Sequence, residues 1–399
     1  MRHRSQADSK LSNRRRVLAE IHLNGPIARS RIAANTGLTP ASISRIARSL
    51  IDSGLIEEGE PAAIEPRVGR KFVDLRIRPG SRYLSAIAIN AFRQDVVVAD
   101  FTNRIVAHRR LRFPDLNDAE AVIETCASTL ALLIDELDID RRALSGCGIA
   151  ITGAVDTSVN RLRSAPALGW GDVDLQSIVL RHLDCPIHSD NIPNAKNLAA
   201  HCFGPTRKAD HVLLFNASLA IGCSLMIEGR LFRGHECRAG MIESMRIPQG
   251  EGGRLLPVDR VAGGIGVLGE TKERPDAGDA ERLVDLMAKA EAGDAGYCER
   301  LRSAGRSLGT VILNADSLLH PDRLLLSGPL LDASAYLEGA LEEIARWMPQ
   351  HTIKDRLAIV PMTSYEAAQS LAVHALLFRD EGFVRRCGPS SSNEEGSPP

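Results

Sequence analysis

The segment TGLTPASISRIARSLIDSGLIEEG, residues 36–59, decides how the first part of this chain folds. Gly37 can adopt the positive φ that a tight turn between two helices requires. Thr39 followed by Pro40 is typical of an N-cap and the first position of a helix. Apolar residues then recur at helical spacing, at Ile43, Ile46, Ala47, Leu50 and Ile51. The pattern predicts a helix from Pro40 to about Ser53 that follows a glycine turn.

Two further helices are predicted before this one, and two strands after it. RRRVLAEIHLN, residues 14–24, has apolar side chains at helical spacing and is followed by a Gly-Pro pair. Residues 28–35 predict a second, short helix, and residues 54–60 and 72–77 predict strands on either side of a basic tip. Two strands joined by such a tip form a wing. Residues 1–80 are therefore predicted to fold as a winged helix-turn-helix.

The free face of the third helix carries small hydroxyl side chains near its start and guanidinium groups one turn later. Small side chains let a helix approach base edges closely, and arginine can bind a guanine edge or a phosphate. A basic wing tip suits a phosphate backbone or a minor groove. The predicted contacts to double-stranded DNA are Thr39, Ala41, Ser42, Ser44, Arg45, Arg48, Arg67, Gly69, Arg70 and Lys71.

Charge is distributed unevenly along the chain. Residues 1–80 hold 15 Lys and Arg against 8 Asp and Glu, a formal charge of +7, whereas the remainder holds 34 against 42, a charge of −8. A purely structural three-helix bundle is the alternative for the first part. Its basic charge, the polar free face of the third helix and the basic tip favour DNA binding over that alternative.

Length and composition indicate a globular protein of two or three domains. The chain has 399 residues, 44% hydrophobic and 25% charged, with no apolar run long enough for a membrane helix and no apolar leader, so we expect a cytoplasmic location. Its eight cysteines lack CxxC spacing and are expected to be free. The pair His235 and Cys237 supplies too few ligands for a zinc site.

From Tyr83 onward, predicted strands and helices alternate, which indicates an α/β fold with room for two lobes. The predicted strands span residues 84–90, 95–101, 104–113, 147–151, 211–216, 221–227 and 323–326. The predicted helices span residues 119–137, 281–290, 295–319 and 365–378.

Four segments of this body resemble the ROK family of sugar kinases and sugar-responsive repressors. They are GIAITGAVDTSVNRLRSAPALGW (148–170), DNIPNAKNLAAHCFG (190–204), SLMIEGRLFRGHECRAGMIE (224–243) and HPDRLLLSG (320–328). With the winged head, the resemblance covers most of residues 12–380, and this combination is the arrangement of the family's repressors.

The resemblance implies a two-lobed, actin-like ATPase fold over residues 81–385. The small lobe would span about 81–190 and the large lobe about 191–370, with a C-terminal helix that returns. The resemblance also implies a homodimer or homotetramer. Residues 386–399, CGPSSSNEEGSPP, have the composition of a disordered tail.

Departures from the family's kinase motifs argue against phosphoryl transfer. ROK kinases hold ATP phosphates with a glycine hairpin, whereas residues 88–93 read AINAFR. The second phosphate turn reads NASLAIG at residues 216–222, and a late Gly-Gly pair has become Ser-Gly at 327–328. The aspartate that the kinases use as general base falls at Ile192, which cannot accept a proton. We therefore expect no catalytic residue and no cofactor.

The family's zinc and sugar ligands are also altered. Ser244 stands in place of a zinc-binding histidine, Met241 in place of a sugar-binding glutamate, and residues 249–264 contain no cysteine. We therefore expect no metal. The remaining candidates for an effector pocket are Gly153, Asp190, Asn191, Glu243 and Ser244.

The altered residues also bear on what such a pocket could bind. Asp190 and Asn191 could equally be loop-end residues that bind nearby backbone. Because Ile192 and Met241 replace acids, a sugar-type or less polar effector is expected, or none.

These patterns predict a DNA-binding transcriptional regulator, expected to be a repressor that binds an inverted repeat as a two-fold dimer. The body would be catalytically inactive and would serve dimerisation and effector sensing. Two alternatives stay open. The chain could be a sugar kinase with an accessory DNA-binding head, or a regulator controlled by a protein partner rather than by a metabolite.

Overall fold

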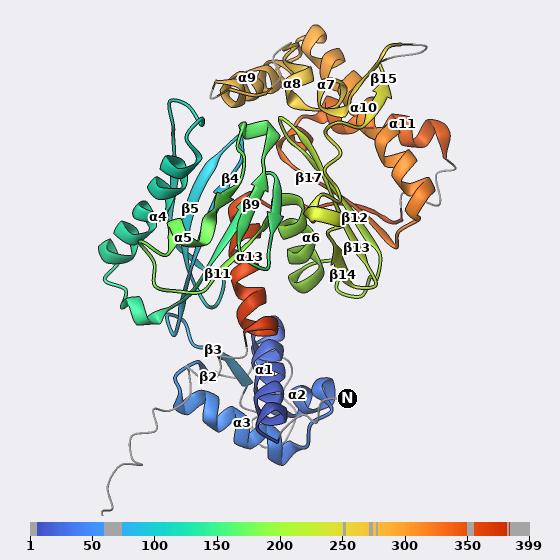
Figure 1. The fold of residues 1–399 in the computed structure, drawn as a ribbon. Coiled ribbons are helices and arrows are strands. Elements are labelled where there is room, and N and C mark those ends of the chain that lie inside the picture. The colour runs from blue at the N-terminus through green and yellow to red at the C-terminus, as the bar shows by residue number, and fades with distance from the viewer. Residues whose placement is uncertain are drawn as a thin grey trace, which may run out of the picture.

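A computed structural model shows a head and two lobes (Figure 1). The described residues are 6–59, 74–249, 253–270, 274–276, 278–348, 355–380 and 383. The predicted wing tip, with Arg67, Gly69, Arg70 and Lys71, lies outside them, and so does the predicted tail, residues 386–399.

The head consists of three helices and a three-stranded sheet. Its elements are α1 (Gln6–Asn24), β1 (Ile27–Ala28), α2 (Arg29–Thr36), α3 (Pro40–Asp52), β2 (Ile56–Gly59) and β3 (Asp74–Ile77). Strand β3 lies between β1 and β2 and is antiparallel to both. This is the predicted winged helix-turn-helix, although α1 begins eight residues before the position expected from the sequence.

The turn between α2 and α3 has the predicted chemistry. Gly37 has a φ of 67° and donates its N–H to the carbonyl oxygen of Ala33 at 2.9 Å, which ends α2. Thr39 accepts a hydrogen bond from the backbone N–H of Ser42 at 3.3 Å and so caps α3. The residues that α3 buries against the other helices are Ile43, Ala47 and Leu50. The apolar spacing therefore predicted correctly which face of α3 turns inward.

The small lobe is built on a five-stranded sheet. In spatial order its strands are β11 (Ile187–Asn191), β7 (Leu144–Ile151), β4 (Tyr83–Ile89), β5 (Gln94–Asp100) and β6 (Ile105–Leu111). Alternate side chains of β4 and β5 point to opposite faces, so one face packs on one helix and the other face on two. These helices are α4 (Ala119–Glu136) on the first face, and α6 (Ile192–Phe203) and α13 (Ser364–His374) on the second. Smaller elements of this lobe are β8 (Ala154–Asp156), β9 (Arg161–Ser164), β10 (Val173–Asp174) and α5 (Leu175–Val179).

The large lobe has a second five-stranded sheet. In spatial order its strands are β14 (Arg230–Phe232), β13 (Ile221–Ile227), β12 (Val212–Ala217), β17 (Arg323–Ser327) and β18 (Leu357–Ile359). Its other elements are β15 (Arg246–Pro248), β16 (Leu255–Pro257), α7 (Val258–Val261), α8 (Gly264–Val267), α9 (Asp279–Glu291), α10 (Ala295–Leu319) and α11 (Ser334–Trp347). Together the lobes form the predicted two-lobed α/β body. None of the helices among the described residues has the length and apolar character needed to cross a bilayer.

The C-terminal segment returns to the small lobe and then reaches the head (Figure 1). Helix α13 packs on β4, β7 and β11, and a π-helical turn at Ala375–Arg379 continues it to α1. One hydrophobic cluster joins this segment, the small lobe and the head. Its members outside the head are Leu84, Phe101, Ala372, Val373, Leu376, Leu377 and Phe383. The head is therefore packed onto the body through a shared apolar core, a contact that the sequence analysis did not predict.

His22 of α1 lies in this joint between head and body. The centroid of its ring is 5.0 Å from that of Phe101 and 6.1 Å from that of Phe203. Both ring nitrogens are shielded from solvent, although part of the ring is exposed. Burial lowers the pKa of His22 to about 4. The packed joint therefore contains a histidine that is neutral at physiological pH.

Acid is expected to destabilise this joint. In the unfolded chain His22 regains its ordinary pKa of about 6.5, so the unfolded state binds more protons than the native state between that pH and the folded pKa of about 4. The contribution of His22 to the free energy of unfolding is fully present above the unfolded pKa. It is lost as the pH falls through this window, by up to about 3 kcal/mol. Replacing His22 with Phe keeps an aromatic ring in the joint and should remove this share of the acid loss.

Urea denaturation at about pH 7 and about pH 4.5 measures the effect as a difference between wild type and H22F. The matched control is H235F, because the side chain of His235 is 94% exposed. An acid loss in H22F equal to that of the wild type would contradict the role given to His22.

Candidate functional site

Helix α3 lies at the end of the head remote from the two lobes (Figure 1), and the side chains of its polar face are accessible to solvent. Thr39, Ala41, Ser44, Arg45 and Arg48 are exposed there, and Ser42 is half-buried because its hydroxyl and N–H both bond Thr39. Among the described residues, neither of these two arginines forms an ion pair. The six predicted contacts of α3 thus share one accessible face.

Other arginines of the head are engaged in contacts within it. Arg29 pairs with Glu58 at 2.5 Å, and Arg76 pairs with Glu57 at 2.7 Å. Arg16 donates a hydrogen bond to the carbonyl oxygen of Thr36 at the end of α2. Exposed pairs of this kind contribute little stability, but they occupy the charges concerned. The guanidinium groups of α3 are, by contrast, available to an anionic partner.

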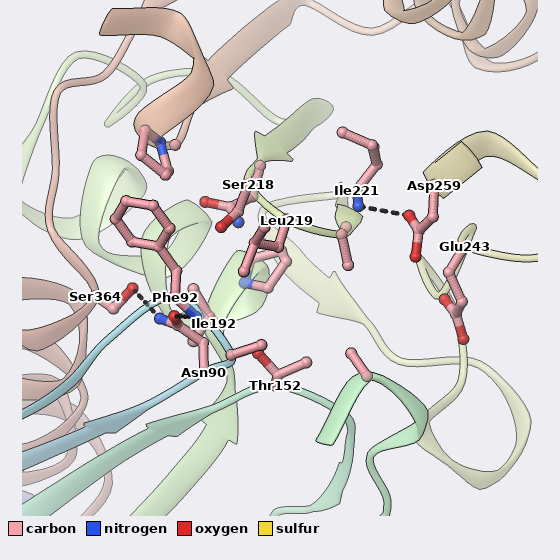
Figure 2. A pocket seen from close by; sticks show the side chains of 18 of the residues that line it. Asn90, Phe92, Thr152, Ile192, Ser218, Leu219, Ile221, Glu243, Asp259 and Ser364 are labelled. Carbon is pink, nitrogen blue, oxygen red and sulfur yellow. Dashed lines mark hydrogen bonds between the residues drawn. The ribbon is translucent and has the colours of Figure 1, made fainter. Parts of the chain in front are cut away.

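A cavity of about 550 Å³ lies between the two lobes (Figure 2). Its walls lie at the carboxyl ends of parallel strands, β4, β7 and β11 in the small lobe and β12 and β17 in the large lobe. Open α/β sheets bind their ligands at this end of the strands. The predicted effector residues that line the cavity are Gly153, Asn191, Glu243 and Ser244.

Asp190 is not among the lining residues, and its contacts are internal. It is 2% exposed and pairs with Arg233 at 2.5 Å, and its other oxygen accepts the backbone N–H of Asn191 at 2.8 Å. Asn191 in turn donates to the carbonyl oxygen of Gly153 at 2.5 Å. Gly153 has a φ of 122°, and an added Cβ would lie 2.3 Å from the carbonyl oxygen of Ser164. Asp190 therefore holds the strand end in shape, whereas Asn191 and Gly153 also face the cavity.

The hairpin that corresponds to the kinase phosphate loop is closed by its own side chain. Oδ1 of Asn90 accepts the backbone N–H groups of Phe92 at 2.8 Å and Arg93 at 2.7 Å. Nδ2 of Asn90 donates to Ser364 at the start of α13 at 3.3 Å, and the ring of Phe92 lines the cavity (Figure 2). The two N–H groups that a glycine hairpin would offer to a phosphate are thus already bonded.

Ile192 occupies the first position of α6, is 2% exposed and lines the cavity (Figure 2). No group on this side chain can accept a proton. Within the described ranges, no cluster of three or more His, Cys, Asp or Glu could hold a metal ion, and the seven described cysteines are free. The cavity therefore presents an apolar side chain at position 192, where the family resemblance places the general base of the kinases.

Asp259 of α7 lines the cavity but was not predicted from the sequence. Its Oδ1 accepts the backbone N–H of Ile221 at 2.7 Å, and Glu243 lies nearby (Figure 2). Burial raises the pKa of Asp259 to about 7, and the negative charge of Glu243 contributes to this rise. The carboxyl group can therefore gain or lose a proton near neutral pH. The sequence feature that could have revealed this residue is the single acid in the run PVDRVAGG, residues 257–264.

Lys196 of α6 is the second lining residue that the sequence analysis missed. Its Nζ donates to Oδ1 of Asn216 at 2.8 Å and to the hydroxyl of Ser327 at 3.0 Å. Burial lowers its pKa to about 8, and the charges of Glu366 and Asp332 oppose this only in part. Ile192 and Met241 do line the cavity, as expected, but so do these charged residues. The lining therefore combines these apolar side chains with charged ones, and the less polar effector stays a prediction.

Residues 86–381 match the model of the ROK family, and residues 11–57 match that of a winged helix-turn-helix DNA-binding domain. The DNA-binding transcriptional dual regulator NagC of Escherichia coli (strain K12) is 24% identical over 352 residues, which cover 84% of this chain and 85% of NagC. The xylose repressor of Bacillus subtilis (strain 168) is 23% identical over 333 residues, which cover 81% of this chain and 84% of the repressor.

Solved structures show the same fold. A ROK family transcriptional regulator described as a homolog of the E. coli MLC protein superposes with a TM-score of 0.72 at 19% identity, covering 95% of this chain and 99% of that one. A ROK family glucokinase from Streptomyces griseus, solved with glucose and AMPPNP, superposes with a TM-score of 0.59 at 19% identity, covering 73% of this chain and 98% of the kinase. Since the family match extends over well more than half of its residues, the chain belongs to the ROK family.

Proposed function

We propose that this chain is a transcriptional repressor that binds an inverted-repeat DNA site through α3 and the wing. The observation that carries the proposal is the accessible face of α3, on which Arg45 and Arg48 have no ion-pair partner among the described residues and lie beside small side chains. This arrangement suits an approach to base edges in a major groove. Relatives named as a dual regulator and as a xylose repressor support the regulatory role and its sign.

The body acts in this proposal without catalysis. Ile192 provides no general base, and Asn90 occupies the hairpin N–H groups that would otherwise contact phosphates. Phosphoryl transfer depends on positioning the phosphates and on accepting the proton of the attacking hydroxyl. Ile192 does not meet the second requirement and the bonded hairpin does not meet the first, which favours a sensor over a sugar kinase.

The proposed organisation follows the same division of roles. Residues 1–80 bind DNA, residues 81–385 form the body, with lobes of about 81–190 and 191–370, and residues 386–399 form a tail. A homodimer or homotetramer formed through the body would present two copies of α3 to half-sites about one helical turn apart, or a multiple of it. As a DNA-binding regulator the chain would work in the cytoplasm.

The C-terminal helix gives the proposed sensor a path to the head. Thr363 and Ser364, at the start of α13, line the cavity. Leu376 and Leu377, just beyond its end, lie in the cluster that includes α1. A ligand that moves the start of α13 would therefore displace the surface on which the head rests. We propose that effector binding alters DNA affinity by this route.

Replacing Arg45 with Ala tests the assignment of α3. If Arg45 contacts a base edge, the loss on the specific site should be about 1–3 kcal/mol, with a much smaller loss on random duplex. R70A, in the wing, should weaken both duplexes alike and flatten the dependence of affinity on salt. Fluorescence anisotropy on a duplex selected from genomic fragments by the purified protein, at several salt concentrations, measures both effects.

The matched control for these variants is R109A, because Arg109 is a surface arginine of the small lobe paired with Glu136 at 3.1 Å. It should bind both duplexes as the wild type does. Equal losses on specific and random DNA for R45A and R70A would contradict the roles assigned to them.

The body is also expected to show no phosphoryl transfer. With glucose, N-acetylglucosamine or xylose as acceptor, a coupled assay of ADP release should show no rate above the background without protein, since Ile192 cannot take the acceptor's proton as an aspartate at that position would. The variant I192D restores a carboxylate but leaves the hairpin bonded by Asn90, so it should remain inactive. Sugar-dependent ADP release by the wild type would contradict the proposal that the body is catalytically inactive.

A further inference from the structure

Lys196 carries a buried charge without an opposite charge beside it. Its side chain is 3% exposed, and within the described part of the chain no carboxylate oxygen lies within 4.0 Å of Nζ. The two acceptors of Nζ, Asn216 and Ser327, are both uncharged. Buried charges in proteins are normally paired, because removing an ion from water without a partner is strongly unfavourable. The position of Lys196 therefore calls for an anion that the described residues do not provide.

The ammonium group lies where a ligand could reach it. Asn216 and Ser327 are neighbours across β12 and β17, at the carboxyl ends of these parallel strands. Lys196, Asn216 and the adjacent Gly328 all line the cavity. Lys196 thus belongs to the wall at which this type of sheet binds ligands.

The first turn of α6 adds positive potential to the same wall. Asn191, Ile192 and Pro193, at the start of this twelve-residue helix, all line the cavity. Asn191 is the N-cap residue and makes no side-chain cap hydrogen bond. The positive end of the helix dipole is therefore not offset by a capping oxygen from this residue, and it adds to the field of the ammonium group.

The neighbouring acidic groups do not neutralise Lys196. Glu366 is held by the N-cap of α13, where its carboxylate accepts the N–H of Thr363 at 2.8 Å and the hydroxyl of Thr363 at 2.7 Å. Asp332 lines the cavity but is exposed to solvent. Arg93 and Asp95, also in the lining, pair with each other at 3.3 Å. Lys196 thus remains a cation that faces the cavity without a contacting carboxylate among the described residues.

We propose that the interlobe cavity binds a small ligand that carries a carboxylate or phosphate group, and that this group is held by Nζ of Lys196 beside the first turn of α6. The inference deepens the proposed function and rests on it only for the ligand's role as effector. The remaining wall, which includes Ile192, Phe92 and Leu219, would contact the ligand's less polar part. Asp259 and Glu243 would form hydrogen bonds with the hydroxyl groups of the ligand.

Isothermal titration of the full chain with matched probes tests this inference. The probes are glucose, gluconate, glucose 6-phosphate and inorganic phosphate; glucose and glucose 6-phosphate share the pyranose ring and differ in the phosphate, whereas gluconate carries its carboxylate on an open chain. At least one anionic probe should bind the wild type about tenfold or more tighter than glucose. The gluconate and phosphate arms distinguish a carboxylate ligand from a phosphate ligand.

The variant K196Q should lose this preference, because glutamine can still bond Asn216 and Ser327 but carries no charge. K196M is a second variant that removes the charge in case K196Q does not fold. K208Q is the matched control, since Lys208 is exposed and outside the cavity lining. Failure of every anionic probe to bind the wild type, or equal binding by K196Q and the wild type, would overturn the inference.

DNA binding by the same proteins separates this inference from the proposed function. Without probe, K196Q should bind the selected duplex as the wild type does, because Lys196 lies in the body and not in the head. A chain that binds an anionic probe through Lys196 but ignores duplex DNA would refute the proposed function alone. A chain that binds DNA but no anion would refute the inference alone.

Discussion

The shared apolar core between the C-terminal segment and α1 is the contact on which the operation of this molecule depends. Without it, the head would be a DNA-binding unit on a tether and the body would have no means of affecting it. Leu376 and Phe101 are fully buried in this core, and burying one such side chain contributes roughly 1.5–3 kcal/mol. Because packed cores are close to crystalline density, a displaced α13 cannot be absorbed by slack in the joint. The joint must either move as a unit or open.

This constraint sets what a ligand in the cavity must do. A ligand changes the head only to the extent that it binds two arrangements of α13 with different affinity. The start of α13 is well placed for such discrimination, since Ser364 contacts Asn90 on one wall and Thr363 lies on the cavity surface. A shift of a few tenths of an ångström there would be felt at Leu376, because the helix between them is continuous and packed on three strands. In this proposal, one continuous helix is enough to couple ligand binding in the cavity to the position of the head.

The position of the cavity and the chemistry of its walls depend on different residues. Its position is set by where parallel strands of both lobes end, and these strands are buried apolar runs that do not depend on catalytic residues. The kinase function instead requires a few particular groups, such as a carboxylate at position 192 and free N–H groups in the hairpin at residues 90–93. Loss of those groups leaves the shape intact. A non-catalytic sensor is thus reachable from this fold by a handful of substitutions.

The sequence predicted the elements whose evidence is local. Helix α3, its glycine turn and its inward face followed from short-range periodicity, and the bounds of β13 and α10 agree with the structure because long apolar patterns identify such elements well. The polar first turns of α1 were missed because they carry no apolar repeat. The three short strands β8 to β10 were missed because two to four residues give little pattern. The joint between α1 and the C-terminal segment was missed because it is a contact between the two ends of the described chain.

The candidate site was harder to predict for a related reason. Family motifs direct attention to the positions where a motif changes, and so Ile192 and Met241 were noticed while Lys196 was not. Lys196 stands in a helical segment of small and apolar residues, in which a lysine suggests an exposed position. Only the tertiary structure shows that this side chain points between two strand ends. For Asp190 the sequence left a pocket residue and a loop-end residue equally open, and its contacts in the structure are internal.

Pairing distinguishes the structural buried charges of this molecule from the functional one. Asp316 is 0% exposed and bonds the guanidinium group of Arg356 at 2.8 Å, and Asp190 bonds Arg233 in the same manner. In both cases the attraction within the pair offsets the loss of hydration, and the pair can be understood as part of the fold. Lys196, the one buried lysine or arginine among the described residues, has two neutral acceptors and an open cavity in front of it. Lys196 thus differs from these ion pairs, and its place on the wall of the interlobe cavity suits a role in ligand binding rather than in stability alone.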